Sequence, residues 1–224
     1  PGLFAMLAYM EHRDGIYHVQ GGLCRISEQM AKVAESHGAE IHLGTPVKQL
    51  ILDKNRAAGL ELENGERVTG DEVVINADFG QAMTTLFPQG ALRKYAPAKL
   101  AKKRFSCSTY MLYLGLDTVY DMPHHTIVFA RDYKRNVEEV FQAKKLSEDI
   151  SLYVRNASVT DPGLAPNGKS AVYVLVPVPN LRGEIDWQEH PASFREKVLD
   201  TIEERTCMTA IRQHIEVEKV LTPE

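Results

Sequence analysis

Hydrophobic residues in the first part of the chain change from a helical period to a strand-like one. Apolar positions recur at helical spacing over residues 23–34, and Gly38 supplies a residue that commonly ends helices. Short β-like runs follow at residues 40–43, 47–52, 59–63 and 67–69, and Asn64-Gly65 between the last two runs is a strong hairpin signal. The pattern predicts a helix, a strand and a small β-meander.

Residues 72–78 form a continuous apolar run that ends in Asn76, Ala77 and Asp78. Such a run is typical of a strand that is buried on both faces in a parallel sheet. We therefore expect a parallel strand here, with its carboxyl end facing a ligand crevice.

The rest of the chain alternates between strand and helix patterns. Residues 81–87 and 91–104 favour helices, the second of them basic and broken or kinked at Pro97. The expected strands are 107–116, 126–129, 152–154, 171–178 and 215–221, and the expected helices are 136–146 and 193–211. The predicted fold class is α/β to α+β.

Composition excludes several classes of protein. The 224 residues are 44% hydrophobic, and 26 Lys+Arg against 30 Asp+Glu give a net charge of −4, which offers nucleic-acid binding no support. The longest uncharged stretch, 79–92, is shorter than the ~20 residues that span a bilayer, so we expect no transmembrane helix. Cys24, Cys107 and Cys207 are widely spaced, so the sequence predicts neither a disulfide framework nor a zinc site. This use of cysteine indicates a reducing compartment.

Residues 163–170 match the phosphate-binding pattern G-x-x-x-x-G-K-[ST] letter for letter. A P-loop requires a helix to begin at its Lys-Ser, whereas the residues after Ser170 are β-branched and uncharged. Pro166 also removes one backbone N–H from the loop. We therefore predict a turn between two strands.

Two pairs of residues are candidates for ligand contact. His124 and His125 are adjacent, and neighbouring side chains on an extended segment point to opposite faces, so we expect structural or substrate-pocket roles rather than a shared metal ion. Gly21-Gly22 before the first predicted helix allows a backbone to approach a ligand, or forms a tight turn. The sequence predicts no metal site.

Several short blocks, spread over nearly the whole chain, occur in an order that one protein family shares. The blocks are Tyr9-Met10-Glu11, Gly15-Ile16-Tyr17, Gly21-Gly22, Gly38-Ala39-Glu40-Ile41, Pro46-Val47, Val74-Ile75-Asn76-Ala77-Asp78, Pro123-His124-His125-Thr126-Ile127, Thr160-Asp161-Pro162, Leu164-Ala165-Pro166, Leu175-Val176-Pro177-Val178-Pro179-Asn180-Leu181 and Asp186-Trp187. In this order the chain resembles the bacterial phytoene desaturase family, the FAD-dependent, amine-oxidase-like polyene desaturases of carotenoid biosynthesis.

The resemblance implies part of a Rossmann-like FAD-binding domain with a β-meander, and a mixed-sheet substrate domain with helices that encloses a tunnel for a phytoene-like polyene. Residues 1–20 and 91–224 would belong to the substrate domain, and residues 21–90 to the FAD-binding domain. The cofactor-binding positions would be Val47, Ala77 and Asp78. The substrate-binding positions would be Gly21, Gly22, His124 and His125. The resemblance assigns no catalytic residues.

The sequence departs from the family because it contains no G-x-G-x-x-G, the motif that holds the FAD pyrophosphate. We therefore expect a central region of a longer enzyme that is inactive alone and binds FAD weakly or not at all. The polyene substrate dissolves in bilayers, which implies a cytoplasmic protein peripherally associated with the membrane. Desaturase, isomerase, oxygenase and saturase activities and the oligomeric state stay open.

Two other interpretations remain. A non-catalytic module could bind an apolar ligand or a membrane surface, with the basic residues 93–104 attracted to anionic lipids. The P-loop match leaves a nucleoside triphosphatase as the third.

Overall fold

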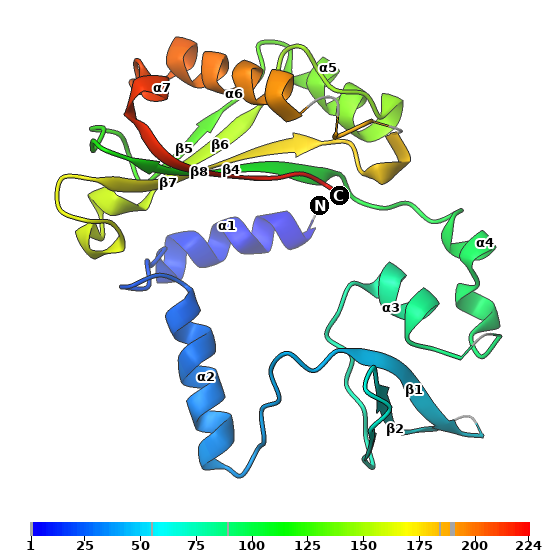
Figure 1. Cartoon of the computed structure of the whole chain (residues 1–224). Helices are drawn as coiled ribbons and strands as arrows, with labels where there is room; N and C mark the ends of the chain where they lie inside the picture. Colours follow the sequence, from blue (N-terminus) through cyan, green and yellow to red (C-terminus); the bar gives the residue numbers. More distant parts are fainter. Residues whose placement is uncertain (1, 55, 89, 184, 189–190) are drawn as a thin grey trace. The chain divides into compact units, whose positions relative to one another are not determined.

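The computed structural model describes residues 2–54, 56–88, 90–183, 185–188 and 191–224 (Figure 1). These residues form two compact units. The sheet unit comprises the chain up to Met30 together with Ser106–Glu224, and the meander unit is Ala31–Phe105.

A five-stranded sheet is the centre of the sheet unit. Its strands are β4 (Ser108–Leu116), β5 (His125–Val128), β6 (Leu152–Asn156), β7 (Ser170–Val178) and β8 (Ile215–Leu221), in the order β5-β6-β7-β4-β8. All five predicted strands are confirmed. Every pair of neighbouring strands is antiparallel, so the expectation of a mixed sheet is wrong. The helical connection from β7 to β8 crosses over β4, so these two strands lie on either side of β4 and each is antiparallel to it.

Helices cover one face of this sheet (Figure 1). They are α5 (Tyr133–Glu138) with the π-helical turn η2 (Glu139–Ala143), the long α6 (Pro191–Arg205) and the short α7 (Ile211–His214). The single helix predicted over 193–211 is two helices, because Ala210 between them has a left-handed φ of 52°. The 3₁₀ turns are η3 (Ala157–Val159), η4 (Pro162–Leu164) and η5 (Leu181–Gly183).

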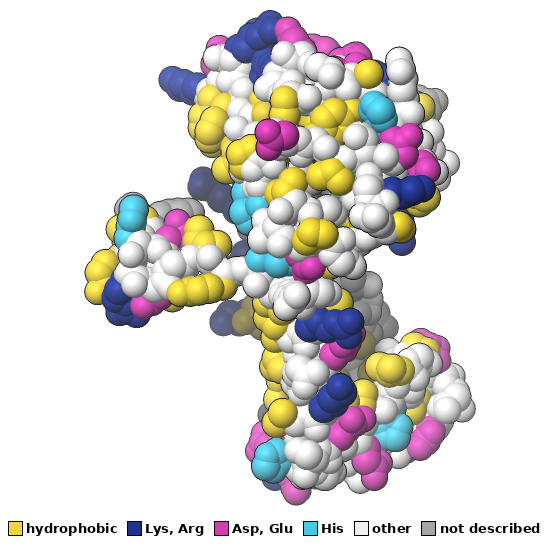
Figure 2. All heavy atoms as spheres, turned by 90° about the vertical axis from the view of Figure 1, so that its left-hand side faces the viewer, with side chains coloured by type: hydrophobic (Ala, Val, Ile, Leu, Met, Phe, Trp, Pro, Cys, Tyr) yellow, Lys and Arg dark blue, Asp and Glu magenta, His cyan; other side chains and the backbone are white. Residues whose placement is uncertain are grey.

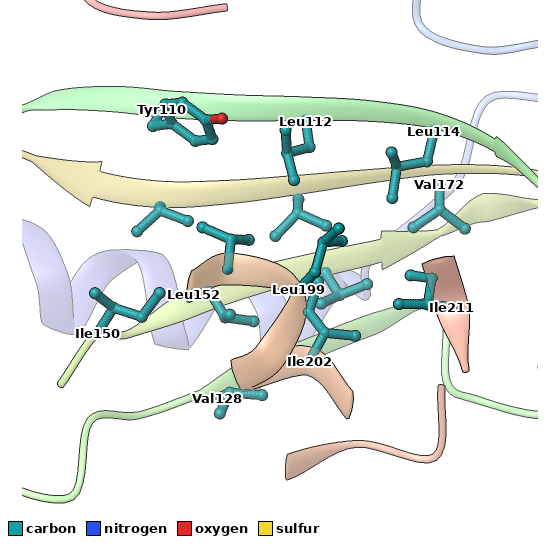
Figure 3. Close-up of a cluster of buried hydrophobic side chains, with 14 of the residues drawn as sticks. Tyr110, Leu112, Leu114, Val128, Ile150, Leu152, Val172, Leu199, Ile202 and Ile211 are labelled. Atoms are coloured by element: carbon teal, nitrogen blue, oxygen red, sulfur yellow. The ribbon is translucent and has the colours of Figure 1, made fainter. Parts of the chain in front are cut away.

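The core lies between α6 and the sheet. Every second residue of β4 and β7 is buried, and Leu112 and Val174 of these strands are fully inaccessible to solvent. Leu199 and Ile202 of α6 pack onto them and are equally inaccessible (Figure 3). Burial of each such side chain stabilises the folded state by about 1.5–3 kcal/mol, so this face of the sheet forms the core of the unit.

Helices at the start of the chain carry exposed apolar side chains. The described side chains of α1 (Gly2–Asp14) are all exposed. The predicted helix before Gly38 is confirmed as α2 (Cys24–Ser36), and Gly38 has a φ of 87° while the N–H of Ala39 donates to the carbonyl of Ala34. The apolar stripe of α2 stays on the surface, where hydrophobic side chains are yellow in Figure 2.

The meander unit contains a three-stranded antiparallel sheet. Its strands are β1 (Val47–Asp53), β2 (Arg56–Leu62) and β3 (Arg67–Thr69). The predicted meander and the Asn64-Gly65 turn are confirmed, with Gly65 at a φ of 85°. The helical elements are α3 (Phe79–Thr85), η1 (Arg93–Tyr95) and α4 (Pro97–Leu100). Pro97 begins α4, so the basic stretch is two short turns instead of one helix.

Two predicted strands are wrong. Residues 40–43 and 72–78 are extended or irregular segments, and Val74 in the second is 92% exposed. A strand needs a neighbour for its backbone hydrogen bonds, and no strand in the described part of the chain pairs with either segment. Where the chain is described, no helix has the length and apolar character needed to cross a membrane.

Candidate functional site

The face of the five-stranded sheet away from α6 carries a second row of side chains. Tyr113 of β4 lies directly opposite Tyr173 of β7, and Tyr173 lies opposite Arg155 of β6. Alternation along each strand places these side chains on the opposite face from the buried core. On the neighbouring edge strand β8, Lys219 faces Tyr113.

A groove of about 480 Å³ lies on this open face. It is lined by Tyr113, Tyr173, Leu164, Val217, Arg155 and Lys219, among others. The wall is mostly apolar and aromatic, with a guanidinium and an ammonium group as its cations. Such a composition suits an extended apolar ligand with π electrons better than a charged one.

Aromatic rings continue from the groove to the edge of the sheet. The ring of Tyr173 lies 5.9 Å from that of Tyr113 and 5.8 Å from that of Tyr153. Tyr153 in turn stacks on His125, with ring centroids 5.9 Å apart. Burial, and then the hydrogen bond to Tyr173, raise the pKa of Tyr153 to about 12, so its hydroxyl stays protonated.

A polar cluster adjoins the groove at Asp161, just before η4. Its Oδ2 accepts a hydrogen bond of 2.6 Å from the backbone N–H of Gly21 and lies 3.1 Å from Nε2 of His18. The N–H of Gly21 and the imidazole of His18 hold the pKa of Asp161 below its usual range. An Arg155 nitrogen lies 3.3 Å from Nδ1 of His18, which links the cluster to the groove wall.

His124 contacts the rings of both other histidines in this region. Its ring lies 5.0 Å from that of His18 and 4.3 Å from that of His125, and its Nδ1 is 2.9 Å from the hydroxyl of Thr160. Burial lowers the pKa of His124, and the neighbouring His125 and Arg155 lower it further. Its Nε2 is buried and has no hydrogen-bond partner among the described residues.

The structure brings the four expected substrate-side residues into one region of the sheet unit. Gly21 and Gly22 form a tight turn with φ of 79° and 93°, and a side chain added at Gly22 would contact Leu164 of the groove. His124 and His125 lie beside the Asp161 cluster and the aromatic rings, respectively.

The three expected cofactor-side residues lie in the meander unit. Val47 opens β1, Ala77 is exposed, and Asp78 caps α3 by accepting a hydrogen bond of 2.8 Å from the N–H of Gln81.

Sequence reasoning missed the groove residues Tyr113, Tyr173 and Arg155, and it missed His18. The only local signal was the alternation of large side chains within the predicted strands, which marks two faces without saying which face is open. The predicted turn at residues 163–170 is confirmed, since β7 instead of a helix begins at Ser170, and Nζ of Lys169 donates to Oε1 of Glu216 at 2.6 Å. Among the residues with described placement, no group of metal ligands occurs.

Comparison with known proteins places this arrangement in a family. The profile described as "Flavin containing amine oxidoreductase" matches residues 1–204. The chain belongs to this flavin containing amine oxidoreductase family. FAD is the cofactor that membership of this family implies.

Individual relatives are similar to the chain along its whole length. It is 54% identical over 224 residues to a protein of Methylomonas sp. named "4,4'-diapophytoene desaturase (4,4'-diapolycopene-forming)", and 37% identical over 226 residues to an "All-trans-zeta-carotene desaturase" of Myxococcus xanthus. These alignments cover 100% and 99% of the chain but 44% and 42% of the relatives, so the chain spans less than half of their length.

A solved structure, described as an oxidoreductase from Methanosarcina mazei, shares the fold of this chain. The two chains superpose with a TM-score of 0.59 at 20% identity, and the match covers 91% of this chain and 42% of the other. At this identity the match supports the fold alone.

The family cofactor can be tested against the residues at hand. Val47 and Ala77 are exposed residues, and the carboxylate of Asp78 already accepts a hydrogen bond from α3. The sequence has no G-x-G-x-x-G turn for the pyrophosphate of FAD. These residues alone therefore do not make a complete flavin site.

Proposed function

We propose that this chain forms the substrate-binding part, and a portion of the cofactor domain, of an FAD-dependent oxidoreductase that introduces double bonds into a long polyene. The observation that carries the proposal is the 54% identity, over all 224 residues, to a protein named a 4,4'-diapophytoene desaturase. The relative named a zeta-carotene desaturase supports the same class of substrate.

The groove on the open sheet face supports this function chemically. Removal of hydrogen from an unactivated C–C bond requires a redox cofactor, because no side chain accepts a hydride. The protein then has to bind the hydrocarbon, orient it and exclude water. Tyr113, Tyr173 and Leu164 offer the apolar, aromatic contacts for that task.

The two units suit a division of labour. We assign residues 1–20 and 91–224 to the substrate-binding domain and residues 21–90 to the FAD-binding domain, with Val47, Ala77 and Asp78 on its cofactor side. The proposed domain boundaries lie upstream of the boundaries between the two compact units, which follow Met30 and Phe105.

The function is tested on the full-length gene product that carries these residues, purified with FAD. Incubation with 4,4'-diapophytoene, and in parallel with phytoene, should lengthen the conjugated system and shift the absorbance to longer wavelength. Absence of new double bonds with either substrate, in protein that binds FAD stoichiometrically, would contradict the proposal. Binding of the polyene without turnover in the same sample would favour the non-catalytic binding module.

Membrane contact follows from the same substrate. Polyenes dissolve in bilayers, so we infer a cytoplasmic protein that associates peripherally with the membrane. The basic side chains of residues 93–104 are exposed, and each contributes roughly 1 kcal/mol near an anionic surface. The triple variant Lys99→Glu, Lys102→Glu and Lys103→Glu should lose flotation with anionic liposomes, and retention of full binding would exclude this surface.

A further inference from the structure

A chain of polar contacts connects the start of the sequence to the groove. Asp161 is 7% exposed and receives the N–H of Gly21 and the imidazole of His18 on the same oxygen, Oδ2. These partners precede it by 140 and 143 residues. Hydrogen bonds between such distant segments fix the Gly21 turn and His18 onto the sheet unit.

The neighbours of His18 determine where its proton lies. The Asp161 side chain is a carboxylate, which only accepts hydrogen bonds, so Nε2 of His18 must carry a proton. The guanidinium of Arg155 only donates, so Nδ1, which lies 3.3 Å from it, must accept. The neutral imidazole with its proton on Nε2 satisfies both neighbours.

This arrangement has a consequence in the groove. The guanidinium carbon of Arg155 lies over the ring of Tyr173, 5.6 Å from its centroid, and both side chains line the groove. An arginine side chain is long and flexible, and the acceptor on His18 restricts where its charge lies. A fixed guanidinium attracts the π electrons of a conjugated chain and has no such attraction for a saturated one.

We propose that Asp161 and His18 are positioning residues that hold Arg155 over Tyr173, and that Arg155 thereby makes the groove prefer the conjugated part of a hydrocarbon over a saturated part. The proposal rests on the proposed function, because it requires the groove to bind a hydrocarbon. Arg155 is the specificity-determining residue, and Asp161 acts only through His18.

The proton position is measured by ¹⁵N NMR of the imidazole groups in the purified 224-residue chain. We expect the wild-type His18 to carry its proton on Nε2. In Asp161→Ala no acceptor remains beside Nε2, so His18 is no longer held with Nδ1 towards Arg155, and both tautomers should be seen. Asp117→Ala is the matched control, since Asp117 lies 2.7 Å from Nδ1 of His214 in an exposed pair, and it should leave His18 unchanged.

Selectivity is measured on the same proteins with lycopene, which is conjugated, and squalane, which is saturated, each presented in detergent micelles. The affinities are measured by equilibrium gel filtration, in which the hydrocarbon that elutes with the protein is extracted and quantified. Arg155→Gln and Asp161→Ala should lower the affinity for lycopene by about 3- to 10-fold and leave that for squalane unchanged. His18→Gln can donate to Asp161 and accept from Arg155, so it should retain more of the preference than His18→Ala.

Different outcomes test hydrocarbon binding by the groove and the positioning of Arg155. If the wild-type protein binds neither hydrocarbon, the proposed function of the groove fails and the selectivity proposal fails with it. If both bind and the variants change their affinities equally, or if His18 keeps its proton on Nε2 alone in Asp161→Ala, the positioning proposal alone is overturned.

Discussion

The hydroxyl oxygen of Tyr153 lies 2.5 Å from Nδ1 of His125, and the two rings stack with planes 17° apart. This contact joins β6 to the edge strand β5 on the open face of the sheet. It continues the row of rings from Tyr113 through Tyr173, so the wall beside the groove is held by ring contacts across four strands. The helix-covered face supplies stability, and the open face is available for a ligand.

Removal of a groove tyrosine should weaken ligand binding without unfolding the chain. Tyr113 is 40% exposed and contacts the ring of Tyr173, so Tyr113→Ala removes aromatic surface from the wall and not from the core. We expect about 3- to 10-fold weaker binding of lycopene, measured by equilibrium gel filtration. Tyr133→Ala, on α5 at the helix-covered side and 53% exposed, is the control and should bind normally.

Acid stability should depend on Glu139 in the turn η2. Ser147, which donates to Oε2 at 2.6 Å, and Arg135, at 3.0 Å from Oε1, lower the pKa of Glu139 from 4.5 to about 2. The unfolded chain therefore binds more protons than the native one below pH 4.5. The stabilisation is complete above that pH and is lost as the pH falls towards 2.

Urea unfolding of the wild type and of Glu139→Gln between pH 7 and pH 3 measures this effect. The variant should be less stable at pH 7 and should lose less stability on acidification. Ser147→Ala, which removes the first hydrogen bond, should reduce the pH dependence in the same direction. An acid dependence identical in Glu139→Gln and the wild type would contradict the assignment.

The sequence predicted elements well where the deciding interactions are local. The helix ending at Gly38, the turn at Asn64-Gly65 and the break at Pro97 depend on backbone preferences of single residues. The strands β4 and β7 follow from alternation of apolar side chains. The strand predicted at residues 72–78 was wrong because a continuous apolar run indicates that a segment favours burial, but it does not show that a neighbouring strand is present to pair with it.

The candidate site was less accessible to sequence reasoning. His124 and His125 were found because adjacent histidines are conspicuous, and Gly21-Gly22 because paired glycines are. The contact between His18 and Asp161 spans 143 residues and has no local pattern. Tyr113 and Tyr173 read as ordinary strand residues, since only the packing of α6 decides which face of the sheet remains open.

Gly59 is essential to the meander because its neighbours leave no room for a side chain. Its φ is 153°, and a Cβ would lie 2.1 Å from the carbonyl oxygen of Val68 on β3. Gly59→Ala should destabilise the meander by about 2–4 kcal/mol, because the two strands must separate. Gly65→Ala is the control: it has φ of 85° but open space, and should cost about 1 kcal/mol. Hydrogen exchange of the β2 and β3 amides reports the difference.

The phosphate-loop match at residues 163–170 should have no nucleotide-binding function. Lys169 is paired with Glu216, and the chain continues into β7 and not into a helix. Lys169→Ala removes a partly exposed ion pair and should change stability by about 0–1 kcal/mol. Calorimetric titration with ATP and Mg²⁺ should show no binding to either protein, and binding that Lys169→Ala abolishes would restore the phosphate-loop interpretation.

The purified 224-residue chain should hold no stoichiometric FAD. Binding of this dinucleotide depends on backbone N–H groups that surround the pyrophosphate, and the sequence lacks the G-x-G-x-x-G turn that supplies them. Of the residues proposed on the cofactor side, Asp78 is engaged in capping α3. Equilibrium dialysis is done at an FAD concentration of about 10 μM, which is 10 times the ~1 μM typical of tight cofactor sites. We expect less than about one tenth of the protein to bind FAD under these conditions. A full flavin spectrum that survives gel filtration would show that the meander unit binds FAD by itself, and the assignment of the missing phosphate contacts would then be wrong.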